Sequence, residues 1–173
     1  MARHLLLTGV PGVGKTTVVR RVVEALGDRP VRGFLTDEIR QGGRRTGFEI
    51  ATLDGSSEVL ASVDLRSTHR VGRYGVDVSA VDRIVAQALE PTDQDELVII
   101  DEIGKMECFS ERFVVAVRRL LHCRCTLLAT IALHGGGPIA EVKRHPEVEL
   151  WRITPANRDD VPDRVVRWLR ALT

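Results

Sequence analysis

The octapeptide GVPGVGKT, residues 9–16, constrains the fold of this chain more than any other feature. It fits the pattern G-x-x-x-x-G-K-[ST] at every fixed position, follows a short apolar run and precedes apolar residues at helical spacing. Glycines let such a loop turn tightly and point backbone N–H groups inward, and the next helix presents its positive end to the same place. The sequence therefore predicts a strand, a phosphate-binding loop and a helix.

Two side chains of this loop have predicted chemical roles. Lys15 is expected to reach the β- and γ-phosphates of a nucleotide, and Thr16 to offer its hydroxyl to Mg²⁺, an ion that prefers oxygen ligands. The predicted phosphate contacts are Gly9, Val10, Pro11, Gly12, Val13, Gly14, Lys15 and Thr16.

The second chemical signal is LVIIDEIGK, residues 97–105, in which a buried apolar run ends on two adjacent carboxylates. Burying charge is costly unless the charge meets a cation or takes part in chemistry. We predict that Asp101 faces Mg²⁺ and that Glu102 polarises an attacking water. In the alternative interpretation, Glu102 only caps the strand or forms a local ion pair.

Predicted strands and helices alternate along the chain, which favours an α/β fold with a mainly parallel sheet and helices on both faces, in a single domain over 1–173. Two alternating segments joined at Asp54-Gly55 predict a hairpin that extends this sheet in antiparallel fashion. The segments 67–76 and 91–96 are expected to be loops. Helices are predicted at 16–26, 79–89, 110–121, within 134–145 and at 159–172; further strands are predicted at 4–8, 31–39, 97–100, 125–133 and 148–154.

The composition excludes several classes of protein. The formal charge is only +1, and 4% of residues are aromatic, so we expect neither a nucleic-acid partner nor a stacking platform for bases. No apolar run approaches the roughly 20 residues that a transmembrane helix needs. The amino terminus shows no cleavage site, and we expect a cytoplasmic protein.

Three cysteines, Cys108, Cys123 and Cys125, form an odd set without secretory signals, which predicts reduced thiols. The segment HCRC, residues 122–125, has two interpretations: part of a metal site, or a helix end entering a buried strand. The second is favoured because no further Cys or His pair stands at zinc-site spacing.

Six segments of the chain resemble the small cancer-related nucleoside-triphosphatase family of bacteria, archaea and animals, and the resemblance extends from end to end. It implies a RecA-like sheet, Mg²⁺ dependence, and slow hydrolysis of ATP, GTP and other nucleoside triphosphates to the diphosphate. No Asn-Lys-x-Asp arrangement is present, so broad base specificity is expected. The segments are GVPGVGKTT, TDEIR, RRTGF, RYGV, IIDEIGKMECFS and TPANRD.

The same resemblance marks further candidate nucleotide contacts. Lys105 is a candidate for neutralising transition-state charge, or else a surface lysine. Asn157 and Arg158 are candidates for contact with the base or ribose, with helix capping as the alternative for Asn157. For the arginines of the extension, a solvated surface role competes with phosphate contact. The candidates are Asp101, Glu102, Ile103, Gly104, Lys105, Asn157 and Arg158, and, on the extension, Glu38, Arg40, Arg44, Arg45 and Phe48.

Two other functions remain open at this point. A small-molecule or nucleotide kinase would use the same phosphate-binding loop, and Arg70 and Arg73 offer only a weak candidate for the arginine-rich lid that such kinases carry. A nucleotide-dependent switch without turnover is the third possibility. We expect a monomer in each case.

Overall fold

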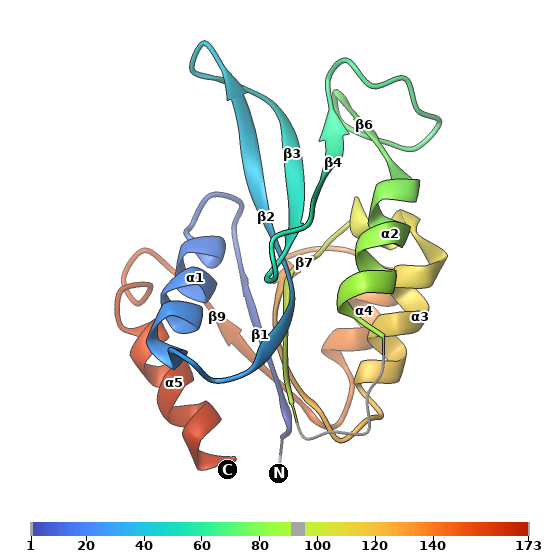
Figure 1. Ribbon diagram of the computed structural model, residues 1–173. Helices are drawn as coiled ribbons and strands as arrows, with labels where there is room; N and C mark the ends of the chain where they lie inside the picture. The colour runs from blue at the N-terminus through green and yellow to red at the C-terminus, as the bar shows by residue number, and fades with distance from the viewer. Residues whose placement is uncertain (1, 91–95, 173) are drawn as a thin grey trace.

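A computed structural model describes residues 2–90 and 96–172 (Figure 1). In these residues nine strands form one sheet in the order β5-β6-β4-β3-β2-β7-β8-β1-β9. The strands from β2 to β9 in this order pair in parallel, and the others pair antiparallel. The predicted α/β class with an antiparallel extension is therefore confirmed.

The strands are β1 (His4–Gly9), β2 (Val31–Gln41), β3 (Arg44–Thr52), β4 (Ser57–Ser62), β5 (Arg70–Val71), β6 (Tyr74–Val76), β7 (Leu97–Ile103), β8 (Thr126–Ala132) and β9 (Val148–Arg152). The helices are α1 (Lys15–Leu26), α2 (Val78–Ala88), α3 (Glu111–Leu120), α4 (Gly137–Lys143) and α5 (Val161–Ala171), with a single 3₁₀ turn at Glu107–Phe109.

Helices cover both faces of the parallel part of the sheet, with α1 and α5 on one face and α2, α3 and α4 on the other (Figure 1). Alternate residues of the strands feed two separate cores because successive side chains of a strand point to opposite faces. Leu5 and Leu7 pack with α1 and α5, whereas Leu6 packs in the core beneath α2 and α3. Ser110 caps α3 by accepting a 3.0 Å hydrogen bond from the Phe113 N–H.

The antiparallel extension holds one difference from the prediction. The turn at Asp54-Gly55 joins β3 to β4, as expected. The segment 67–76, however, is not all loop, because Val71 pairs with Tyr74 across Gly72 to form the short hairpin β5–β6. Two- and three-residue strands are too short to show a period-2 pattern, which explains why the sequence did not predict them. The predicted loop 91–96 lies, apart from Glu96, outside the described residues.

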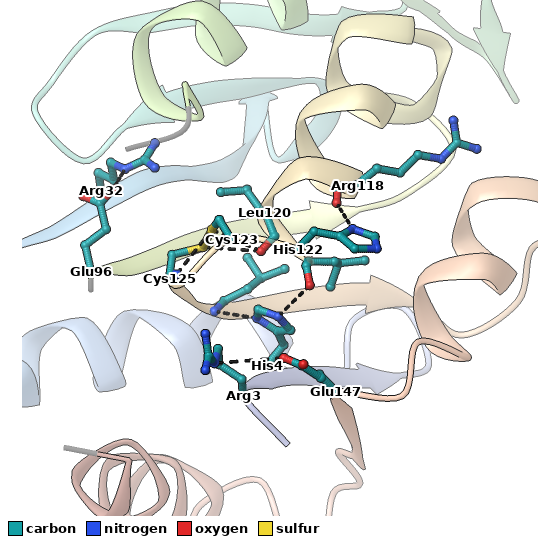
Figure 2. The surroundings of a disulfide bond; sticks show 12 residues. Arg3, His4, Arg32, Glu96, Arg118, Leu120, His122, Cys123, Cys125 and Glu147 are labelled. Carbon is teal, nitrogen blue, oxygen red and sulfur yellow. Dashed lines mark hydrogen bonds and ion pairs between the residues drawn. A yellow bond between two sulfur atoms is a disulfide. The ribbon is translucent and has the colours of Figure 1, made fainter. Parts of the chain in front are cut away.

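Cys123 and Cys125 form a disulfide where the chain passes from α3 to β8 (Figure 2), so the prediction of thiols is wrong for these two residues. The tight bend brings their Cα atoms within 5.4 Å, inside the ordinary range for a disulfide. Spacing along the sequence did not reveal this bend. Cys108 is a free thiol.

No helix of the described residues is long and apolar enough to cross a membrane.

Candidate functional site

The loop between β1 and α1 has the backbone of a phosphate cradle. Gly12 and Gly14 have φ angles of 79° and 111°, which a residue with a Cβ rarely adopts. No side chain caps the start of α1, so the first N–H groups of this helix remain available to an anion.

Lys15 lies folded back over this loop. Its ammonium donates a 3.0 Å hydrogen bond to the Gly9 carbonyl and lies 3.7 Å from Oε2 of Glu102. The side chain of Lys15 is only 10% exposed. The structure thus brings the Lys15 cation, at the start of α1, close to a carboxylate at the end of β7. In the sheet, β8 lies between β7 and β1, the strand that precedes α1.

Asp101 is 1% exposed and is surrounded by hydroxyl groups. Thr16 donates to its Oδ2 at 2.8 Å, Thr130 donates to its Oδ1 at 2.6 Å, and Thr36 lies 3.5 Å from Oδ2. Burial raises the pKa of Asp101, and the hydrogen bonds from Thr130 and Thr16 act against this rise. Three parallel strands, β2, β7 and β8, and the first turn of α1 therefore converge on one carboxylate.

Glu102 is half-buried and follows Asp101 through a cis peptide bond. The register of β7 against β8 shifts between Ile100 and Ile103, so the two acids lie in an irregular part of the strand. Burial raises the pKa of Glu102, and the nearby charge of Lys15 lowers it. Glu102 is thus a carboxylate with raised basicity beside the loop lysine.

Beyond Glu102 the chain turns at Gly104. A Cβ on Gly104 would lie 2.9 Å from Oε1 of Glu102 and 3.0 Å from Oε2 of Glu107, so a side chain at this position would require these two carboxyl groups to move. Burial, followed by the charge of Glu102, raises the pKa of Glu107 to about 8, so Glu107 is mainly protonated at neutral pH. Lys105 is exposed, and Ile103 is buried in the core.

Lys143, at the end of α4, was not among the predicted site residues. Its ammonium donates a 2.8 Å hydrogen bond to the carbonyl of Leu133, the residue that follows β8. Burial lowers the pKa of Lys143 and the charge of Glu102 raises it. No sequence pattern marked Lys143 as a site residue, and its proximity to Glu102 is a result of the fold, in which α4 follows β8 and Lys143 binds the Leu133 carbonyl.

Arg158 and Asn157 lie in the turn between β9 and α5, and their side chains bind different parts of the structure. Arg158 donates a 3.2 Å hydrogen bond to the Val13 carbonyl, so it rests on the loop after β1. The Asn157 amide is used within its own turn: Oδ1 accepts from the Thr154 N–H at 2.8 Å and Nδ2 donates to the Arg152 carbonyl at 2.9 Å. Asp160, not Asn157, precedes α5 as its N-cap residue.

The predicted residues of the extension form their own cluster. Glu38 pairs with Arg40 at 2.6 Å and with Arg45 at 2.9 Å, and Arg45 also donates to the Tyr74 hydroxyl. Arg45 and then Arg40 lower the pKa of Glu38 through these hydrogen bonds. Arg44 is exposed, and Phe48 packs edge-on to Tyr74. In the described part of the chain, no hydrogen bond or ion pair joins this cluster to residues 9–16.

The oxygen atoms around Asp101 fit a magnesium ion. The Thr16 hydroxyl and the Asp101 carboxylate are hard oxygen donors 2.8 Å apart, next to the phosphate cradle. Few protein ligands suit Mg²⁺, because this ion keeps several waters. Thr16 and Asp101 are the residues that would hold it.

The sequence and the fold are similar to those of known proteins. A family model described as NTPase matches residues 4–166. The human cancer-related nucleoside-triphosphatase is 41% identical over 95% of this chain and 96% of its own length, and nucleoside-triphosphatase THEP1 of Aquifex aeolicus is 38% identical over 95% and 98%. The crystal structure of THEP1 from A. aeolicus gives a TM-score of 0.81 at 38% identity over 96% of this chain and 98% of that one. The solution structure of a human cancer-related nucleoside triphosphatase gives 0.85 at 38% identity over 98% of both chains.

Proposed function

This chain belongs to the NTPase family and is a nucleoside-triphosphatase, and we propose that it hydrolyses ATP, GTP and other nucleoside triphosphates slowly, with Mg²⁺, to the diphosphate and phosphate. The observation that carries this proposal is the arrangement of two adjacent acids. Asp101 lies within hydrogen-bond distance of the Thr16 hydroxyl, whereas Glu102 lies beside the Lys15 ammonium.

In the proposed reaction, the residues of this chain bind the triphosphate and manage one proton. The N–H groups of residues 9–16 and the Lys15 ammonium hold the phosphates. Glu102 accepts a proton from water as the water oxygen bonds to the γ-phosphorus and the bond to the β-phosphate oxygen breaks. The raised basicity of Glu102 suits this role, because a stronger base takes the proton more readily. Mg²⁺, when bound, neutralises charge on the phosphate oxygens.

We assign supporting roles to two further residues. Lys105, an exposed residue three positions after Glu102, neutralises charge that develops on the γ-phosphate. Arg158 contacts the base or ribose, since its guanidinium already rests on the loop at Val13. Broad base specificity follows from the lack of an Asn-Lys-x-Asp arrangement in the sequence.

We also propose that the protein is a single domain over 1–173, and that it works as a cytoplasmic monomer without a nucleic-acid partner. A single sheet runs through the described residues, and the near balance of basic and acidic residues supports the lack of a nucleic-acid partner.

The decisive experiment measures phosphate release from ATP with Mg²⁺ and no other acceptor, and repeats it with an excess of chelator. Turnover that requires Mg²⁺ but no acceptor is the expected result. Turnover that begins only when a nucleoside or nucleotide acceptor is added would indicate a kinase reaction and not hydrolysis. Tight nucleotide binding without release of phosphate would indicate a switch.

A further inference from the structure

A cavity of about 420 Å³ opens beside the proposed nucleotide site and contains none of its phosphate-loop residues. Three segments line it: Arg70, Val71 and Gly72 of the β5–β6 hairpin; Lys105, Cys108 and Phe109 after β7; and four residues of 135–139 after β8. The loops after β7 and β8 leave the same edge of the sheet as the phosphate loop after β1. The cavity therefore lies at the same edge of the sheet as the phosphate loop, and it shares Lys105 with the proposed nucleotide contacts.

The size of the cavity exceeds what hydrolysis needs. A water molecule takes about 30 Å³ of liquid volume, whereas clefts of about 300–1,000 Å³ are typical of small-molecule sites. An organic molecule of modest size matches the space.

The walls favour an anion. Two lining residues, Arg70 and Lys105, are cationic, and none of the lining residues carries a carboxylate. The Cys108 thiol adds no negative charge, because burial raises its pKa to about 12. Arg70 already donates to the Leu65 and Arg73 carbonyls, so a carboxylate or phosphate group here would meet the Lys105 ammonium and the remaining N–H groups of Arg70.

The rest of the wall favours a ligand with a carbon skeleton. Val71, Phe109 and Ile139 present apolar surface to the cavity. The Phe109 ring packs against the His69 ring, with centroids 5.0 Å apart. Bare inorganic phosphate would leave this apolar surface unused.

We propose that this cavity binds a second small molecule, an organic anion, alongside the nucleoside triphosphate. The proposal rests on the proposed function for the identity of the neighbouring ligand. It does not require that the second molecule react.

The test uses the whole ¹⁵N-labelled protein, saturated with Mg-ADP and then titrated with phenyl phosphate or with inorganic phosphate. Phenyl phosphate carries both an anion and an apolar ring. We expect saturable shifts of the Gly72, Gly135 and Gly136 amide signals, with tighter binding of phenyl phosphate than of inorganic phosphate. The Gly12 and Gly14 signals report binding of Mg-ADP separately. The same spectra therefore distinguish a protein that does not bind the nucleotide from a cavity that does not bind phenyl phosphate.

Three variants make the test specific. Gly136→Leu should abolish the shifts at Gly72 and Gly135 by filling the cavity, since Gly136 has an ordinary φ of −94° and no atom within 4 Å of an added Cβ. Arg70→Gln should weaken phenyl phosphate binding about tenfold, which corresponds to about 1.4 kcal/mol. Arg66→Gln, an exposed arginine that does not line the cavity, is the matched control and should bind as the wild type does.

Two results would overturn the proposal: no saturable shift at these glycines in the protein saturated with Mg-ADP, or unchanged binding by Gly136→Leu. Equal affinity for inorganic phosphate and phenyl phosphate would also overturn it, because the ligand would then need no carbon skeleton.

Discussion

The Lys15 ammonium and the Glu102 carboxylate lie 3.7 Å apart, although β8 lies between β1, which precedes Lys15, and β7, which carries Glu102. Each group changes the other's surroundings: the charge of Lys15 lowers the pKa of Glu102, and Glu102 supplies a counter-ion to a lysine that is 10% exposed. A triphosphate would offer Lys15 a stronger partner than one carboxylate. Glu102 would then be free to bind water.

Glu102→Gln is expected to lower the rate of phosphate release about 100-fold or more while leaving nucleotide affinity nearly unchanged, because the amide keeps the shape but cannot accept the proton. Lys15→Ala should weaken triphosphate binding and abolish turnover. Steady-state phosphate release and calorimetric titration with a non-hydrolysable triphosphate measure the two effects. Glu111→Gln, an exposed acid of α3, is the control. Wild-type turnover by Glu102→Gln would show that Glu102 is not the base.

Thr130→Val is expected to lower turnover about tenfold or more and to raise the Mg²⁺ concentration needed for half-maximal rate. The substitution removes the 2.6 Å hydrogen bond to Oδ1 of Asp101 at nearly constant volume, and a lost hydrogen bond to a charged group costs about 1.5–3 kcal/mol. Thr126→Val on the same strand is the matched control. An unchanged Mg²⁺ dependence in Thr130→Val would mean that Thr130 does not position the proposed metal ligand.

Lys143→Met is expected to move the acidic limb of the pH–rate profile to higher pH. Lys143 helps to lower the pKa of Glu102, so without its charge Glu102 stays protonated to a higher pH and the active ionised form appears later. The measurement is kcat/KM for ATP from pH 5 to 9. Arg144→Met, one residue further on and exposed, should leave the profile in place. If both variants keep the wild-type profile, Lys143 is only an anchor for the Leu133 carbonyl.

Much of the parallel sheet and the family were predictable because their signals are local. The pattern at residues 9–16 contains both the turn glycines and the helix start, and the apolar run before Asp101 marks a buried strand. The family prediction from the motifs is confirmed by the match over residues 4–166. The roles of individual site residues stay predictions, including those of Lys105 and Arg158.

Other features depend on contacts that no local pattern records. Thr130 and Thr36 meet Asp101 only because β8 and β2 flank β7. Lys143, on α4, is held by a hydrogen bond to the carbonyl of Leu133, which lies in the loop after β8. The Cys123–Cys125 disulfide depends on a bend at the end of α3 that a count of cysteines cannot reveal.

His4 should make the protein less stable as the pH falls from about 6.5 to 4. Its ring is fully buried. Nδ1 accepts from the Leu127 N–H at 3.2 Å, which leaves Nε2 to donate to the Leu121 carbonyl at 3.3 Å (Figure 2). Burial lowers the pKa of His4 from 6.5 to about 4, so in this range the unfolded chain binds a proton that the folded chain does not. The linked loss is up to about 3 kcal/mol at pH 4.

Urea denaturation of the wild type and His4→Gln between pH 4 and 7.5 measures this effect. The wild type should be the more stable protein at pH 7, and its advantage should shrink as the pH falls, because Gln does not titrate. His122→Gln, an exposed histidine nearby, should show the wild-type dependence. A constant difference between His4→Gln and the wild type at all pH values would mean that His4 titrates normally in the folded state.

Asn157→Ala and Arg158→Ala should separate a structural residue from a nucleotide contact. Both ends of the Asn157 amide are bonded within the β9–α5 turn, so its loss should lower the free energy of unfolding by about 1–3 kcal/mol. Arg158 instead reaches across to the Val13 carbonyl, and its loss should raise KM for ATP with little change in kcat, as expected for a contact equally strong in the ground and transition states. Thermal unfolding and steady-state kinetics on both variants distinguish these outcomes. A raised KM in Asn157→Ala at unchanged stability would show that Asn157 contacts the nucleotide. Its amide would then have to leave the turn and bind the base or ribose.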